Sequence, residues 1–422
     1  MRISSALYFQ TGVNTLNKQE SELLHLFQQI GTGRRMITPA DDPLAAAQSI
    51  TLAQSQSMNQ RFKANREVAT QALGESENVL NNVVNQLVDL KTRLIEASNA
   101  TLSDQDRASL AHVLSQSQET LLGTMNATDA SGHYLFSGSK STSVPFSLNE
   151  GRYVYQGDKG EIAARNVRIE HSRILNVGNA GNDVFLRAAP GTVAFLSAST
   201  KANQGSAVLG AMQIHDTQKA SQVQDVMMTY VDGDQEQWQL QVHYRDEEGK
   251  SAVATYDLAA DSSTLRVDLQ EEFGLSFEIR GTPEVGDQVS YHQVQFLNGS
   301  DELNILNVLS EVVEALEQPI QNNSVAAAHL HNTLNRAIQA VDIAYDNVLT
   351  VQASIGSRMN ELESLHHSGD LQALQLAKEL SRLEDVDYYT ASSQLALRKM
   401  ALEAASVAFM KIQGTSLFSM GK

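Results

Sequence analysis

The 422-residue sequence predicts an α+β fold, in which both termini form an elongated helical bundle with coiled-coil packing and a β-rich outer domain is inserted between them. Three observations lead to this prediction. Apolar residues recur every three or four positions near both ends, which is the spacing of helices that pack as coiled coils. In the middle of the chain the period falls to two, as in β-strands. Only 6 prolines occur in the whole chain, so long helices can run without interruption.

A heptad pattern near the N-terminus predicts the first helix and one side of a coiled-coil seam. Gly31-Thr32-Gly33 predicts the end of this helix. The next helix is expected to begin with Asp42 as its N-cap and Pro43 at its first position, and to run to about Asn99. The seam positions, interrupted by the polar Glu20, are Ala6, Phe9, Val13, Leu16, Leu23, Phe27 and Ile30.

The second helix carries its own apolar stripe, and a third helix follows it. Ser103-x-x-Asp106 has the spacing of a capping box and predicts the start of that third helix, which ends near Gly132. The stripe predicted to be buried on the second helix consists of Ala69, Ala72, Ser76, Val79, Val83, Leu87, Leu90, Leu94 and Ala97.

Alternating apolar and polar residues predict strands from about residue 134 onward. Val226–Tyr256 is expected to form a three-stranded meander with turns at Asp232–Asp234 and Asp246–Gly249. Two further strands are expected around Phe277 and Tyr291, where apolar residues again alternate with polar ones.

Helical spacing returns near residue 303 and continues to the C-terminus. Leu334, Val341, Val348, Ile355 and Leu362 are each seven residues apart, which predicts a buried row on one long helix. A polar run at residues 366–370 predicts a break before the last helix. On that last helix Leu395, Leu402 and Phe409 form one row, and Leu397, Met400, Ala404 and Val407 lie beside it.

The two ends of the chain therefore mirror each other, each with a terminal heptad helix and a longer helix nearer the middle. An inserted domain needs its entry and exit close together, so the two arms are expected to pack side by side. The predicted parts are residues 1–42 and 371–422 (terminal coiled-coil domain), 43–186 and 298–370 (helical rod domain, with a β hairpin in its first part), and 187–297 (inserted outer domain).

Composition argues against several classes of partner and chemistry. The formal net charge of −18 disfavours binding to nucleic acid or to anionic lipid. With no cysteine there is no disulfide or thiol catalysis, and with no run of 18 apolar residues no membrane span is expected. The N-terminus lacks the apolar core of a signal peptide, which taken alone predicts a cytoplasmic protein.

No catalytic motif is found, so neither an enzymatic activity nor a cofactor is expected. The His366-His367 and His329-x-His331 pairs are the best metal candidates, but neither spacing places both rings on one helix face. Asp232, Asp234 and Glu236 lack the remaining ligands of a calcium loop, so a hairpin turn is the better interpretation.

The terminal seam has two interpretations. It can be an ordinary helix pair within one chain, or it can be the surface through which copies of the chain join. Seven seam side chains bury too little apolar area to offset the entropy of ordering the first 30 residues. We therefore expect both ends to become ordered only when neighbouring copies supply more surface.

Several motifs, in the same order along the chain, resemble the flagellin family. Gly31–Ala45 resembles the N-terminal signature of the family, which contains an Asp-Asp-Pro run. Ser354–Asn360 resembles a conserved stretch of its C-terminal region, with Ser357 in place of the usual alanine. Leu383–Tyr388 resembles the segment that opens the last helix, and Thr415–Phe418 resembles the hydrophobic end. The opening Met1–Ser4 is more similar to the hook-associated junction members than to filament flagellins.

This resemblance implies a structural subunit of the bacterial flagellum that joins hook to filament. It also implies leaderless export through the flagellar channel, and as partners a ring of identical subunits, a neighbouring hook-associated protein, flagellin and an export chaperone. Filament flagellin, which shares the core motifs, is the alternative within the family. A cytoplasmic helical signalling module is the alternative from another class, and the β insertion argues against it.

Overall fold

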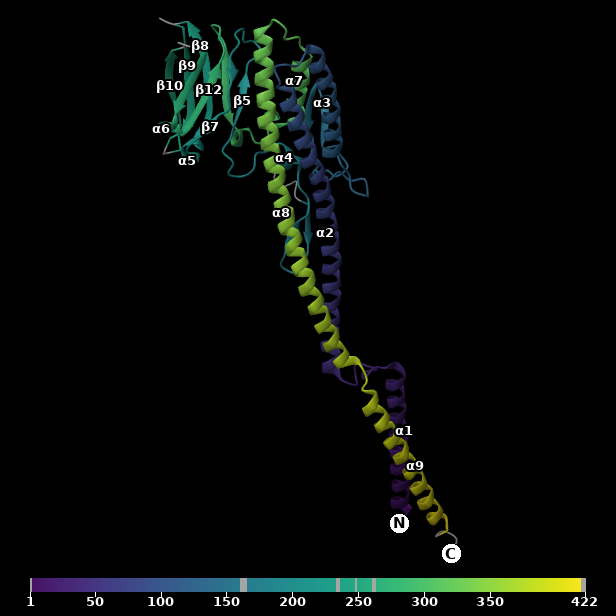
Figure 1. Ribbon diagram of the computed structural model, residues 1–422. Helices are drawn as coiled ribbons and strands as arrows, with labels where there is room; N and C mark the ends of the chain where they lie inside the picture. The colour runs from purple at the N-terminus through teal and green to yellow at the C-terminus, as the bar shows by residue number, and fades with distance from the viewer. Residues whose placement is uncertain (1, 160–164, 233–235, 247–248, 260–262, 419–422) are drawn as a thin grey trace. The chain divides into compact units, whose positions relative to one another are not determined.

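A computed structural model describes residues 2–159, 165–232, 236–246, 249–259 and 263–418. The fold has helical termini and a central β-rich region, as the sequence predicts (Figure 1). Two compact units can be separated, one made of residues 1–65 and 363–422 and the other of residues 66–362. Among the described residues, no helix is long and apolar enough to cross a membrane.

Four long helices account for most of the helical structure. They are α1 (Arg2–Thr32), α2 (Pro43–Ala97), α8 (Ser324–Glu384) and α9 (Tyr388–Phe418). The shorter helices are α3 (Asp104–Met125), α4 (Gly181–Phe185), α5 (Thr217–Ala220), α6 (Gln270–Phe273) and α7 (Ile305–Glu317), with 3₁₀ turns η2 (Val294–Leu297) and η3 (Asp301–Leu303). The predicted capping box at the start of α3 is confirmed, because the Ser103 hydroxyl accepts from the Asp106 N–H and the Asp106 carboxylate accepts from the Ser103 N–H.

Antiparallel packing of α2 on α8 builds the helical core of residues 66–362. Gln352 Nε2 donates to Asn81 Oδ1 at 2.9 Å, and Lys91 Nζ lies 2.6 Å from Asp342 Oδ1. The α8 row predicted from the seven-residue spacing is confirmed, since all of its members are buried: Leu334, Val341, Val348, Ile355 and Leu362. α3 and α7 complete this core, where Gln118 Nε2 donates to the Leu306 carbonyl at 2.7 Å.

The stripe predicted on α2 is wrong at two positions. Ala72 and Val79 are only partly buried, and their neighbours Leu73 and Leu80 are fully buried in their place. The buried positions then follow one uninterrupted alternation of three and four residues from Ala69 to Ala97. Each replacement puts the larger side chain into the core, where burying more apolar area is more favourable.

The helix break predicted at residues 366–370 is also wrong. α8 continues through this polar run to Glu384, and the break lies at residues 385–387. Residues of α2 provide polar partners for this run. Asn59 Nδ2 donates to the Gly369 carbonyl at 3.0 Å, and Lys63 Nζ lies 3.0 Å from Asp370 Oδ1. His366 and His367 consequently lie on one continuous helix.

The inserted outer domain is a sandwich of two antiparallel sheets, and its strands follow the predicted pattern. In the described part of the chain, one sheet has the order β10-β9-β8-β13-β5, and the other has the order β11-β12-β6 with β7 also paired to β12. The turns predicted at Asp232–Asp234 and Asp246–Gly249 lie partly outside the described residues, and Asp234 itself lies outside them. The strands are β5 (Phe195–Ser199), β6 (Val208–Leu209), β7 (Gln213–Ile214), β8 (Val223–Asp232), β9 (Glu236–Arg245), β10 (Ser251–Ala259), β11 (Thr264–Leu269), β12 (Leu275–Arg280) and β13 (Gln288–Gln293).

Side chains from the inner faces of both sheets fill the sandwich core. Trp238 and Tyr291 are fully buried from one sheet, and Phe277 of the other sheet lies with its ring centroid 4.8 Å from that of Tyr291. Two small hairpins precede the sandwich, one formed by β1 (Phe146–Asn149) with β2 (Arg152–Tyr155), the other by β3 (Asn166–Arg168) with β4 (Ile174–Asn176).

The entry and exit strands of the sandwich are direct neighbours. Phe195 pairs with Gln293 in the register of β5 and β13, and the Val294 N–H donates to the Ala194 carbonyl at 3.0 Å. The outer domain therefore leaves and rejoins the helical part at neighbouring positions, as expected for an inserted domain.

Deletion of residues 195–293, with Ala194 joined to Val294 through an Asn-Gly turn, is expected to leave the helical part folded. Ala194 and Val294 lie next to the paired ends of β5 and β13 and are joined by a backbone hydrogen bond, and a two-residue turn fits that geometry. Far-UV circular dichroism should show a retained helical signal with a cooperative melt. Loss of the helical signal would mean that the sandwich is part of the folding core of the helices.

Candidate assembly surface on the terminal helices

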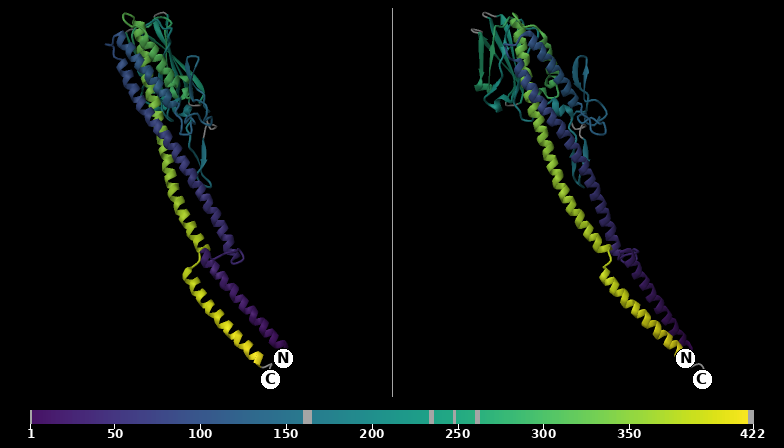
Figure 2. Two further views of the ribbon diagram at one scale, coloured as in Figure 1. Left: turned by 90° about the vertical axis from the view of Figure 1, so that its right-hand side faces the viewer. Right: turned by 45° about the vertical axis from the view of Figure 1, so that its right-hand side comes forward.

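α1 and α9 form an antiparallel pair along their whole length, and they lie side by side in every view (Figures 1 and 2). Three contacts fix the register. The rings of Phe9 and Phe409 have centroids 5.2 Å apart, Glu22 forms an ion pair with Arg398, and Gly33 lies beside the Tyr388 hydroxyl. Gly12 lies so close to the Phe409 ring that a side chain there would displace it. The two ends of the chain thus pack on each other, as the mirrored sequence pattern predicts.

Little of this helix pair is buried. Among the described side chains of the pair, the buried apolar ones are Leu26 on α1 and Ala391 on α9. The α9 row of Leu395, Leu402 and Phe409, here called the inner row, is partly buried and lies on the side of α9 that faces α1.

The structure places the predicted α1 seam residues in two groups. Val13, Leu16, Leu23 and Ile30 are partly buried in the helix pair, whereas Phe9 and Phe27 are at least half exposed. Phe27 is replaced in the seam by its neighbour Leu26, which the heptad pattern did not predict. Adjacent apolar residues can both fit a helical stripe, and one partner helix covers only one of the two. The side chain of Ala6 lies outside the described residues.

A second apolar row on α9 is largely exposed. It consists of Leu397, Met400, Ala404 and Val407, here called the outer row, and its three large side chains are 60%, 57% and 49% exposed. Leu24 and Phe27 on α1 and Met410 on α9 are similarly exposed. A helix that is apolar on several sides is normally buried on several sides. The terminal pair therefore presents apolar surface suited to further helices.

Two of the segments that resemble the flagellin family, Gly31–Ala45 and Leu383–Tyr388, contact each other where the terminal helices end. The Arg35 N–H donates to the Glu384 carbonyl at 2.6 Å, and the Val386 N–H donates to the Gly33 carbonyl at 2.9 Å. The Arg35 guanidinium also donates to the Leu383 carbonyl at 3.1 Å. Gly33 has a positive φ of 72°, a conformation that glycine adopts without strain. This joint holds the breaks after α1 and before α9 together.

Two neighbouring carboxylates order the segment that leads into α2. Asp41 Oδ2 accepts from the Thr38 and Ile37 N–H groups, and these hydrogen bonds hold the pKa of Asp41 below its usual value. Because the pKa is lowered in the folded chain, this contribution is present above about pH 4 and is lost as the pH falls through the lowered pKa. Asp42 Oδ1 accepts from the Ala45 N–H at 3.0 Å, one residue before α2 begins at Pro43.

Replacing Asp42 with alanine is expected to destabilise the start of α2 by about 0.5–2 kcal/mol, because an N-cap acceptor is lost. Hydrogen exchange at the Ala45 and Ala46 amides should become faster. Asp42→Asn, which keeps a capping oxygen, should stay close to the parent protein. Equal exchange in all three proteins would contradict the capping role.

The histidine pairs considered as metal candidates all lie on α8. Among the described residues, no group of three histidine, aspartate or glutamate side chains is placed to hold a metal ion. His329 borders a cavity that is lined by α7, α8 and residues 199–207. Part of the Asp232, Asp234 and Glu236 set lies outside the described side chains.

Comparison with known families agrees with the motifs in the terminal segments. The profile of the bacterial flagellin N-terminal helical region matches residues 3–141, and that of the C-terminal helical region matches residues 338–420. Together they cover more than half of the chain. The chain belongs to the flagellin family and is a structural component of the bacterial flagellum.

Within the flagellin family, the relatives that match most of the chain are hook-associated proteins. The chain is 26% identical to flagellar hook-associated protein 3 of Escherichia coli strain K12, and the match covers 100% of both chains. It is similar to two crystal structures from Legionella pneumophila. Flagellar hook associated protein-3 is 27% identical with a TM-score of 0.64 and covers 79% of this chain and 98% of its own. Flagellar junction protein FlgL is 26% identical with a TM-score of 0.60 and covers 80% and 100%.

Flagellins proper match much less of the chain. Phase 1 flagellin of Salmonella naestved is 26% identical over 151 residues, which is 33% of this chain and 28% of that flagellin. The similarity to filament flagellin is therefore distant.

Proposed function

We propose that this chain joins the hook of the flagellum to its filament, as a structural subunit without catalytic activity. The observation that carries the proposal is the end-to-end match with a hook-associated protein, set against a match to filament flagellin that covers 33% of the chain. A junction subunit has to hold two different neighbours. We therefore infer as partners identical copies in a ring, a second hook-associated protein on one side and flagellin on the other.

The surface proposed for joining is the exposed apolar part of the terminal helix pair. The inner row, with Val13, Leu16, Leu23 and Ile30 of α1, holds one chain's two ends together. The outer row with Leu24, Phe27 and Met410 remains available for neighbouring subunits. Apolar side chains that are half exposed in a single chain lose that exposure when helices of other copies cover them, which favours association.

The family resemblance also leads us to propose leaderless export through the flagellar channel, with a chaperone that covers the apolar C-terminal helix until assembly. A reporter fused after residue 42 should then reach the medium only in cells with an intact flagellar export apparatus. Retention of the reporter in the cells would contradict the export proposal.

Limited proteolysis of the monomer should trim about residues 1–35 and 390–422 first, because the helix pair of a single chain buries few apolar side chains and can open locally. Full protection of both ends in a verified monomer would contradict the proposal that neighbouring copies complete the order of these ends.

Deletion of the gene for this chain tests the junction role. Mutant cells should carry hooks without filaments and release flagellin into the medium, and the wild-type gene supplied in trans should restore filaments. If the chain were instead the filament subunit, its loss would remove the filament protein itself from the medium. Filaments of normal length on the deletion strain would contradict both roles.

A further inference from the structure

Side-chain amides of α8 anchor the outer β domain to the helical part. Asn332 acts like a peptide group, since its Oδ1 accepts from the Leu209 N–H at 2.8 Å and its Nδ2 donates to the Ala207 carbonyl at 2.9 Å. Asn335 Nδ2 donates to the Leu209 carbonyl at 3.1 Å, and Gln339 Oε1 accepts from the Ser197 N–H at 3.1 Å. Asn332, Asn335 and Gln339, here called the amide row, share one face of the helix.

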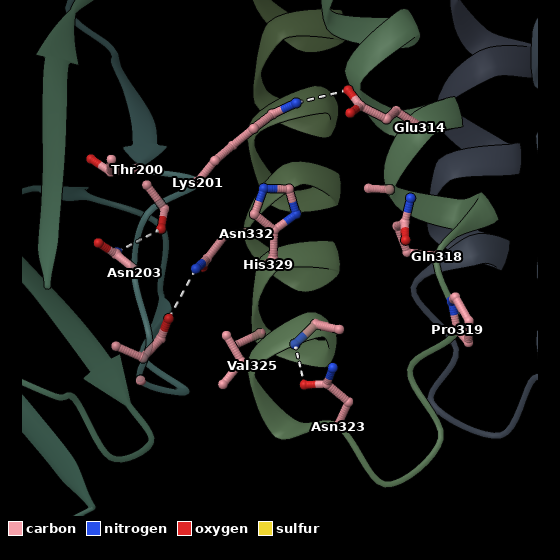
Figure 3. Close-up of a pocket in the computed structure, with 16 residues that line it drawn as sticks. Thr200, Lys201, Asn203, Glu314, Gln318, Pro319, Asn323, Val325, His329 and Asn332 are labelled. Atoms are coloured by element: carbon pink, nitrogen blue, oxygen red, sulfur yellow. Dashed lines mark hydrogen bonds and ion pairs between the residues drawn. The ribbon is translucent and has the colours of Figure 1, made fainter.

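His329 lies on α8 one turn before Asn332, where the same face borders a cavity of about 500 Å³ (Figure 3). Outer-domain residues 199–207 form one wall of the cavity, and α7 and α8 form the other. Lys201 of the outer domain reaches across it, with its Nζ 2.7 Å from Glu314 Oε2 of α7. His329 is therefore placed where the outer domain meets both helices.

Charged groups surround His329 from each element packed against it. Lys201 approaches from the outer domain, Glu311 and Glu314 from α7, and Arg336 from α8 itself, where its Nη1 lies 3.6 Å from Glu311 Oε2. Partial burial of the ring, aided by the positive charge of Lys201, lowers the pKa of His329, although Glu314 and Glu311 act in the opposite direction. The neutral ring is thus the form that the docked arrangement favours.

We propose that His329 makes docking of the outer β domain sensitive to protons, so that charging this ring loosens the amide row from the outer domain. In the undocked arrangement the ring is in water and away from Lys201, so it takes up a proton more readily. The undocked state then binds more protons than the docked state, and docking weakens as the pH falls below the ordinary histidine pKa of about 6.5. Above that pH both states hold a neutral ring and docking is unaffected.

Hydrogen exchange of the full chain tests the proposal at the Leu209 amide, which donates directly to Asn332. After correction for the intrinsic effect of pH on exchange, the opening constant at Leu209 should rise by about threefold to tenfold between about pH 8 and pH 5.5. Amides of β8 in the sandwich core serve as the reference and should not change. They separate undocking from unfolding of the outer domain, which holds other histidines.

His329→Gln should abolish this pH dependence, because glutamine keeps a polar side chain and cannot be charged. His331→Gln, two residues along the same helix, is the matched control and should keep it. Lys201→Gln leaves His329 in place and should shrink the dependence, which provides a test even if the His329 variant folds poorly. The proposal is overturned if the opening constant at Leu209 does not change with pH in the parent protein. It is also overturned if His329→Gln shows the same pH dependence as the parent, or if Lys201→Gln leaves the pH dependence unchanged.

Discussion

Replacing Leu397 and Met400 together with aspartate is expected to abolish attached filaments while leaving the stability of the single chain almost unchanged. Both side chains belong to the outer row of α9 and are more than half exposed in the chain. Changes at exposed positions usually alter the free energy of unfolding by no more than about 0.5 kcal/mol each. Thermal melts of the variant and the parent should therefore agree within a few degrees.

If the outer row is the joining surface, as we propose, the same two charges would be buried against neighbouring helices in the assembled flagellum. Burying a carboxylate without a partner costs several kcal/mol, or the group takes up a proton at a similar cost. In the proposed ring of identical subunits this penalty would recur at every contact, so joining should fail although each chain folds. Cells that carry the variant should be non-motile and should release flagellin into the medium.

Conservative apolar changes provide the control. Leu397→Met with Met400→Leu keeps the outer row apolar at nearly the same volume, so motility should remain normal. A large drop in the melting temperature of the aspartate variant would mean that the outer row belongs to the core of the single chain. Normal filaments on cells with the aspartate variant would show that the outer row is not used in joining.

Val348→Asp should instead destabilise the single chain. Val348 is fully buried in the central row of α8, so the change loses apolar burial and places a carboxyl group in the helical core. We expect a loss of about 3–6 kcal/mol in the free energy of unfolding. The melting temperature should fall on the order of 10 °C, and the variant should be depleted in cells.

The adjacent residue supplies a matched control for this substitution. Leu349 lies on the same helix but is exposed, so Leu349→Asp should lower the melting temperature by no more than a few degrees. Similar losses for the two variants, measured by thermal or denaturant unfolding of the purified chain, would contradict the heptad core of α8.

The spacing of apolar residues alone predicts those elements of the fold in which that spacing is strictly regular. Val348 and its four heptad partners on α8 are buried as expected, because a strict seven-residue period leaves one solution for the apolar face. The meander around Trp238 is likewise predictable, since an alternating pattern fixes which side of each strand faces the core.

Where two apolar residues are adjacent, spacing cannot decide which of them is covered. Leu73 and Leu80 replace the predicted Ala72 and Val79 on α2, and Leu26 replaces Phe27 on α1. In each case a partner helix, distant in the sequence, decides which of the two adjacent residues is buried. The continuous α8 helix at residues 366–370 has a similar cause, because Asn59 and Lys63 satisfy polar groups that lie some 300 residues away in the sequence.

The candidate surface could be predicted only in part for the same reason. Both apolar rows of α9 are visible in the sequence, but their separation into an inner and an outer row depends on the position of α1. The structure assigns Leu395, Leu402 and Phe409 to the helix pair and leaves Val407 exposed. The part of the surface proposed for neighbouring subunits thus includes Leu397 and Met400, which the sequence had placed beside the main row.

Immunogold labelling of intact flagella tests the junction role most directly. Antibodies raised against the outer domain, residues 195–293, recognise a part of the chain that lies away from the terminal helices in sequence. If the chain joins hook to filament, we expect one narrow band of gold on each flagellum, at the boundary between hook and filament. Gold distributed along the whole filament would contradict the junction role and identify the chain as a filament subunit.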